Sequence, residues 1–139
     1  MNKEFWFSGK GCVRIPVIFS AGILVFSFLA LSATQKDYSE CIKKYNSVWG
    51  EPCVQCTEFR NSYRVSLRNT CAETLDVKCA VRENDNRWRT FIKLDLFPKD
   101  TMTAYACNGT GKYMVWAKRA GDKMNEFPTD NEINAQFGK

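Results

Sequence analysis

The chain has 139 residues, no histidine and a formal net charge of +5. This length accommodates one domain. Because histidine is the usual general base, proton shuttle and metal ligand near neutral pH, its absence excludes Ser-His-Asp and Cys-His catalysis. Carboxylate-pair hydrolysis stays possible in principle, and the closest pairs are Glu73 with Asp76 and Glu83 with Asp85. Both pairs lie at predicted strand ends or turns, where solvated charges are ordinary, so we expect no enzyme, no cofactor and no metal site.

Residues 1–32 are predicted to be a secretory signal peptide, with cleavage near residues 32–33. A basic start with Lys3, Lys10 and Arg14 precedes an apolar run over residues 15–31, and small residues follow it. The alternative is an uncleaved membrane anchor, although this run is at the short limit for spanning a bilayer. We expect a secreted protein, or a periplasmic or cell-surface one after cleavage, with membrane contact only through an uncleaved leader.

The charge of the chain beyond the leader limits its partners. It carries 17 Lys and Arg against 14 Asp and Glu, a net charge of +3. This charge fits weak attraction to acidic glycans or acidic surfaces. It is too small to indicate nucleic-acid binding, for which domains commonly have a pI above about 9.

Residues 33–57 are predicted to form a short helix and a Cys-rich loop. Asp37 lies three residues before Glu40, as in a capping box, and Cys41, Ile42 and Tyr45 follow at helical spacing. This pattern predicts a helix over residues 38–45. The glycine, proline and two cysteines of residues 46–57 are typical of a loop held by disulfides.

Residues 58–120 are predicted to form a β domain. Side chains alternate between apolar and polar in the first two runs, and the turns between runs contain Asn, Asp, Pro or Gly. Five short strands are expected, over residues 61–68, 75–82, 88–97, 101–107 and 112–118. In the third, we expect a shared face of Trp88, Thr90, Ile92, Leu94 and Leu96.

The last segment, residues 121–139, is predicted to be a polar C-terminal tail that wraps the surface or is mobile. The predicted fold class is therefore mainly β. It is a small antiparallel β-sandwich or meander of about five strands, with a short N-terminal helix and disulfide staples.

Six cysteines remain beyond the leader, and an even number in an exported domain indicates a disulfide framework. The disulfide candidates are Cys41, Cys53, Cys56, Cys71, Cys79 and Cys107. Six thiols allow 15 pairings, and the sequence does not choose among them. Cys53 and Cys56 also form a C-x-x-C, but it lacks the βαβ context of a thiol oxidoreductase, and the spacing of Cys53, Cys56, Cys71 and Cys79 is too wide for a zinc ribbon.

Two groups of residues are candidates for contacting a ligand. Strand parity places six basic side chains on the polar faces of successive strands, where a single sheet would present them to an anionic ligand: Arg64, Arg68, Lys78, Arg82, Arg89 and Lys93. Four aromatic side chains could stack on sugars or anchor a partner: Trp88, Tyr105, Tyr113 and Trp116. The alternatives are a solvated sheet face for the first group and core packing for the second.

The function expected from these features is an exported, non-enzymatic binding or accessory module. It would present a basic and aromatic sheet surface to a protein or an acidic glycan. An alternative is a subunit of a larger cell-envelope or surface assembly, which would expose an apolar patch. A less favoured alternative is a thiol-disulfide redox protein acting through Cys53 and Cys56.

Overall fold

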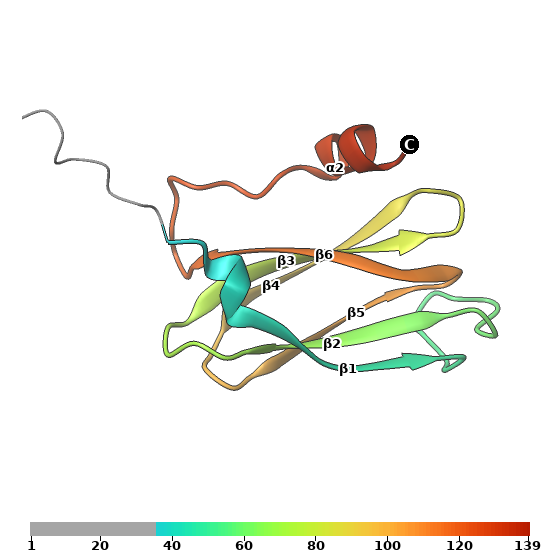
Figure 1. Ribbon diagram of the computed structural model, residues 1–139, viewed down its shortest axis with the longest axis horizontal. Helices are drawn as coiled ribbons and strands as arrows, with labels where there is room; N and C mark the ends of the chain where they lie inside the picture. Colours follow the sequence, from blue (N-terminus) through green and yellow to red (C-terminus); the bar gives the residue numbers. More distant parts are fainter. Residues whose placement is uncertain (1–35) are drawn as a thin grey trace, which may run out of the picture. The chain divides into compact units, whose positions relative to one another are not determined.

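The computed structural model describes residues 36–139, and Asp37–Lys139 form one compact unit. The predicted signal peptide lies outside the described residues. Within residues 36–139, six antiparallel strands form two three-stranded sheets that face each other in two layers (Figure 1). The prediction of a mainly β sandwich is confirmed, with one strand more than expected.

The first sheet has the strand order β1-β2-β5, and the second has the order β4-β3-β6. The strand bounds are β1 (Ile42–Trp49), β2 (Tyr63–Asn69), β3 (Leu75–Glu83), β4 (Trp88–Leu96), β5 (Thr101–Ala106) and β6 (Gly109–Arg119). Only β1-β2 and β3-β4 are pairs of consecutive strands. After β2, β4 and β5 the chain crosses to the other sheet, which excludes the alternative of a meander.

The core lies between the two sheets. Alternate residues of β2 and β5 point into it from one side, and alternate residues of β3 point into it from the other. Its fully buried members include Val65, Leu67, Ala104, Leu75, Val77, Cys79 and Val81. The alternation read from the sequence for β2 and β3 therefore gave the correct inward faces of these two strands.

Two disulfides join the sandwich at its ends. Cys41, just before β1, is bonded to Cys71, just after β2. Cys56, in the β1–β2 loop, is bonded to Cys107, in the β5–β6 turn. Disulfides persist in oxidising compartments, so these bridges indicate an extracytoplasmic location.

The predicted N-terminal helix over residues 38–45 is wrong. A single 3-10 turn, η3 (Tyr38–Cys41), begins at the N-cap Asp37, whose side chain accepts a hydrogen bond from the Ser39 N–H. The chain then enters β1, which pairs along its length with β2. The local pattern favoured a helix, but pairing with a strand some 20 residues further on decided the conformation.

The predicted shared face of the third strand is also wrong in part. Ile92 and Leu94 are 57% and 60% exposed, while Phe91 packs against the core opposite Cys79. The pairing with β3 shifts register near Asp95, whose φ is 52°. This β-bulge changes the parity of the strand, and Leu96 beyond it is fully buried.

The C-terminal segment contains a helix, α2 (Asp130–Phe137), and not only a polar tail. Its N-cap Thr129 forms a capping box with Glu132: the Thr129 hydroxyl accepts from the Glu132 N–H, and the Glu132 carboxylate accepts from the Thr129 N–H. Figure 1 shows α2 lying beside the sheet β4-β3-β6, on the side away from the other sheet. Ile133, which is 1% exposed, packs there against Ala80 and Trp88.

Candidate ligand-binding face

The outer face of the sheet β1-β2-β5 carries basic and hydroxyl-bearing side chains. Because Val65 and Leu67 point into the core, the residues that alternate with them on β2 point outward. Cross-strand pairing then sets their neighbours on β1 and β5. Three rows result: Val48–Arg64–Tyr105, Asn46–Ser66–Thr103 and Lys43–Arg68–Thr101.

Arg68 is the central cation of this face. Its guanidinium lies 3.7 Å from the ring centroid of Tyr45, a side chain that is 60% exposed. Within residues 36–139, no carboxylate pairs with Arg68, and its buried Nε has no hydrogen-bond partner. The Tyr45 ring holds the guanidinium in place, so an anionic acceptor would find an oriented guanidinium without a carboxylate partner here.

Arg64, at the other end of the same strand, is already paired. Its Nη2 contacts the Glu51 carboxylate, which the β1–β2 loop brings over the face. The Glu51 carbonyl oxygen in turn accepts a hydrogen bond of 2.6 Å from the Ser62 hydroxyl, which fixes the loop. The unneutralised positive charge therefore gathers around Arg68 and the exposed side chain of Lys43.

The other four predicted basic residues lie on the second sheet, so the six do not share one face. Lys78 is 4% exposed and is covered by the segment that leads into α2. Arg82 donates to the Asn86 side chain and to the Lys139 carbonyl oxygen. Arg89 points toward Cys107, and Lys93 is exposed on the edge strand β4.

The predicted aromatic residues are mostly structural. Trp88 is 9% exposed, and its Nε1 donates to the Phe137 carbonyl oxygen at 2.9 Å. Tyr113 packs against the core between the sheets, and Trp116 packs against the cluster under α2. Tyr105 lies in a row of the candidate face by its backbone pairing, but its ring packs against the other sheet, 4.8 Å from the Phe91 ring and 4.6 Å from the Arg89 guanidinium.

Sequence reasoning missed Lys43 and Tyr45 as members of this face. Both belong to β1, which the sequence presented as a helix followed by a loop. Their signal is weak, because a bulge between Lys44 and Asn46 interrupts the alternation of β1. The strand becomes recognisable only through its pairing with β2.

Four of the six candidate cysteines form the two disulfides, and Cys53 and Cys79 have free thiols. Cys79 is fully buried between the sheets, and this burial raises the pKa of its thiol from an ordinary value of 9.0 to about 12. Its place in the core of β3 keeps it from a partner, so the expectation of a complete six-cysteine framework is wrong for these two. Among the described residues, no group of three or more His, Cys, Asp or Glu side chains could hold a metal ion.

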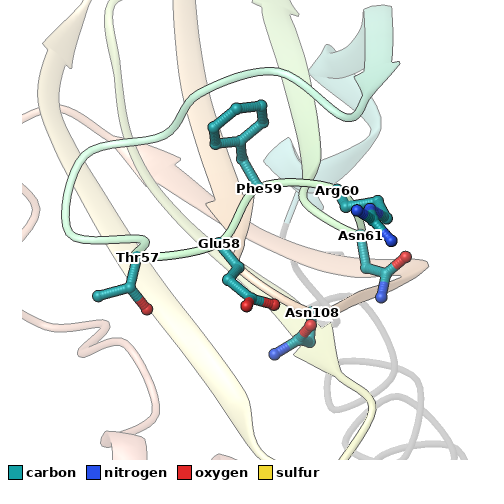
Figure 2. A pocket seen from close by; sticks show the side chains of 6 residues that line it. All are labelled: Thr57, Glu58, Phe59, Arg60, Asn61 and Asn108. Atoms are coloured by element: carbon teal, nitrogen blue, oxygen red, sulfur yellow. The ribbon is translucent and has the colours of Figure 1, made fainter.

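Two hollows adjoin the Cys56–Cys107 bridge at the loop end of the sandwich. The first, of about 420 Å³, is shown in Figure 2 and is lined by Thr57, Glu58, Phe59, Arg60, Asn61 and Asn108. All six are exposed side chains. The second lies between the β3–β4 turn and α2 and also includes Asn108. Neither encloses a ligand, so the flat outer face is the stronger candidate site.

The chain matches no family model, and no curated protein or solved structure is detectably similar to it. In the described part of the chain, no helix is long and apolar enough to cross a membrane.

Proposed function

We propose that this chain is an exported, non-enzymatic binding module that presents the outer face of the sheet β1-β2-β5 to an acidic glycan. The observation that carries the proposal is the Arg68 guanidinium, which stacks on Tyr45 and lacks a carboxylate partner in residues 36–139. Lys43 lies beside it in the same row. A sulfate or carboxylate group of a polysaccharide supplies the missing acceptor.

The composition of the face favours a glycan over a protein partner. The cores of protein interfaces are rich in apolar side chains and poor in charges. Here the central positions are Arg68, Ser66 and Thr103, with Asn46 beside them. Hydroxyl, amide and guanidinium groups next to an exposed tyrosine ring match the hydroxyls, anionic groups and flat faces of sugars.

The test is binding of the full chain, expressed with its own leader, to a sulfated polysaccharide and to a polyuronate, with neutral dextran as the reference. Arg68→Gln with Lys43→Gln is expected to weaken binding to the acidic polymers at least tenfold, because the lost contact of the half-buried Arg68 costs about 1.5 kcal/mol and that of the exposed Lys43 adds less. The affinity should also fall as salt increases. The matched control, Lys112→Gln with Lys123→Gln, removes two exposed charges elsewhere and should bind like the unaltered chain. Equal losses in both double variants would contradict the proposal, as would binding to dextran alone.

A second candidate function, a subunit of a larger surface assembly, is favoured by a separate observation. Ile92, Leu94 and Phe97 are each more than half exposed on or beside β4, an edge strand. Exposed apolar side chains on a free sheet edge are typical of contacts between proteins. Sedimentation velocity distinguishes this function: Ile92→Lys with Leu94→Lys should release a co-purified partner and leave glycan binding unchanged.

A further inference from the structure

The free thiol of Cys53 lies in the same short turn as a disulfide-bonded cysteine. The Cys56 N–H donates to the Cys53 carbonyl oxygen at 3.2 Å, and Gln55 between them has a φ of 67°. A four-residue turn of this kind holds its first and last Cα atoms within about 7 Å. Disulfides span Cα distances of about 4.4–6.8 Å, so the turn keeps Cys53 and Cys56 near the geometry of a bridge.

The other cysteine of that disulfide, Cys107, contacts a cation. Arg89 Nη1 donates to Cys107 Sγ at 3.2 Å. The guanidinium is held in place by the Gln55 side-chain oxygen, which accepts from its Nη2 at 2.8 Å, and by the ring of Tyr105. An adjacent guanidinium stabilises a thiolate, so Cys107 is a good leaving group when the bridge is attacked.

We propose that Cys53, Cys56 and Cys107 form a thiol-disulfide exchange site whose substrate is the thiol of another molecule. In the first step, the Cys53 thiolate attacks Cys56 Sγ. The Cys53–Cys56 bond forms and the Cys56–Cys107 bond breaks, and its electron pair leaves on Cys107 Sγ beside Arg89. The proton lost by Cys53 passes to water, and no oxidant or reductant is consumed.

In the second step, the substrate thiolate attacks Cys53 Sγ in the new bridge. A mixed disulfide forms between the substrate and Cys53, and the electron pair of the Cys53–Cys56 bond leaves on Cys56 Sγ, which takes a proton from water. The turn is accessible for this attack, since Val54 is 73% exposed and Gln55 is also exposed. Cys79, the other free thiol among residues 36–139, is fully buried and takes no part.

The test measures how fast reduced glutathione opens the Cys56–Cys107 bridge in the full chain. Samples are quenched with acid, alkylated and mapped by mass spectrometry. In the unaltered chain we expect glutathione on Cys53 and alkylated thiols at Cys56 and Cys107. Cys53→Ser should open at least tenfold more slowly, because glutathione must then attack the partly buried bridge directly.

Arg89→Gln tests the role of the cation and should slow opening severalfold. The matched control, Arg119→Gln, removes a guanidinium that donates to the Tyr38 hydroxyl and should leave the rate unchanged. As a second variant, Cys107→Ser should form the Cys53–Cys56 bridge when oxidised glutathione is added, which takes up the two electrons and is released as two reduced glutathione molecules; mapping should then find both thiols protected. Equal opening rates in the unaltered chain and Cys53→Ser would overturn the proposal. Glutathione on Cys107 in place of Cys53, or free Cys53 and Cys56 in folded Cys107→Ser, would also overturn it.

Discussion

Replacing Asp130 by alanine tests how α2 is fastened to the sheet β4-β3-β6. The Lys78 ammonium is buried under the segment before α2, with a side chain only 5% exposed. It donates to Asp130 Oδ1 at 2.6 Å and to the Pro128 carbonyl oxygen at 2.8 Å. Asp130→Ala leaves this buried cation with one acceptor fewer.

The expected loss follows from the chemistry of that contact. A hydrogen bond to a charged group contributes about 1.5–3 kcal/mol, and the Asp130 side chain is 63% exposed, which places this pair near the low end. Asp130 is also the first residue of α2, and a carboxylate at this end of a helix contributes about 0.3–1 kcal/mol to stability through the helix dipole. We expect Asp130→Ala to lower the free energy of unfolding by about 2 kcal/mol.

A double-mutant cycle in urea separates the two contributions. Lys78→Met replaces the ammonium by an apolar side chain of similar length, so Asp130→Ala in that background should cost only the dipole contribution. The coupling energy between the two positions should then be about 1–2 kcal/mol, measured from tryptophan fluorescence. A coupling energy below about 0.3 kcal/mol would refute the reasoning that this pair fastens α2.

The same pair predicts how the effect depends on pH. The hydrogen bonds from Lys78 and then from Thr90 lower the pKa of Asp130 below its ordinary value of 3.8. A carboxyl with a lowered pKa stabilises the fold above its unfolded pKa, and this contribution is lost as pH falls through the folded value. The difference between the unaltered chain and Asp130→Ala should therefore be constant from about pH 5 to 7 and shrink below about pH 4.

Two further predictions concern the core and the loop end. The buried Cys79 thiol should resist alkylation in the folded chain, while the Cys53 thiol reacts. Burial raises the pKa of Cys79 from 9.0 to about 12, so the free energy of unfolding should fall as the pH rises above about 9, where the unfolded chain loses this proton and the folded chain keeps it. Labelling of Cys79 at the same rate as Cys53 would show that the core is open. Gly109→Ala should lower the melting temperature and cost about 1–3 kcal/mol, because a Cβ at this position would lie 2.4 Å from the Tyr63 Cβ. An unchanged melting temperature would mean that the β5–β6 turn moves freely away from β2.

The elements predicted correctly are those whose local pattern and tertiary role agree. Apolar residues of β2 and β3 alternate with polar ones, and the alternate residues do face the core. The helix α2 was missed although its signal is local: Thr129 precedes Glu132 by three residues, and Ile133 follows. The segment is rich in acidic and amide side chains, and its helix buries one apolar side chain fully, Ile133, so no apolar helical period indicated the helix.

The candidate face could be predicted only in part. Arg64 and Arg68 were placed on one polar face by parity, and the structure keeps them together on β2. Their separation from Lys78 and Arg82 could not be read from the sequence, because it depends on which sheet each strand joins. The chain passes from the first sheet to the second between β2 and β3, and no local sequence pattern indicates this connection.

By itself, the sequence determined the class of protein: a small β domain with paired cysteines and no histidine chemistry. It also predicted strands over residues 61–68 and 75–82, which in the structure are β2 (Tyr63–Asn69) and β3 (Leu75–Glu83). These properties follow from composition and from a side-chain period of two, which are local. Only the tertiary structure decided the two disulfides, the burial of Lys78 and the exposure of Ile92. Each of these features depends on contacts between segments that are far apart in the chain. Such contacts decide which side chains are buried, whatever the local alternation of apolar and polar residues predicts.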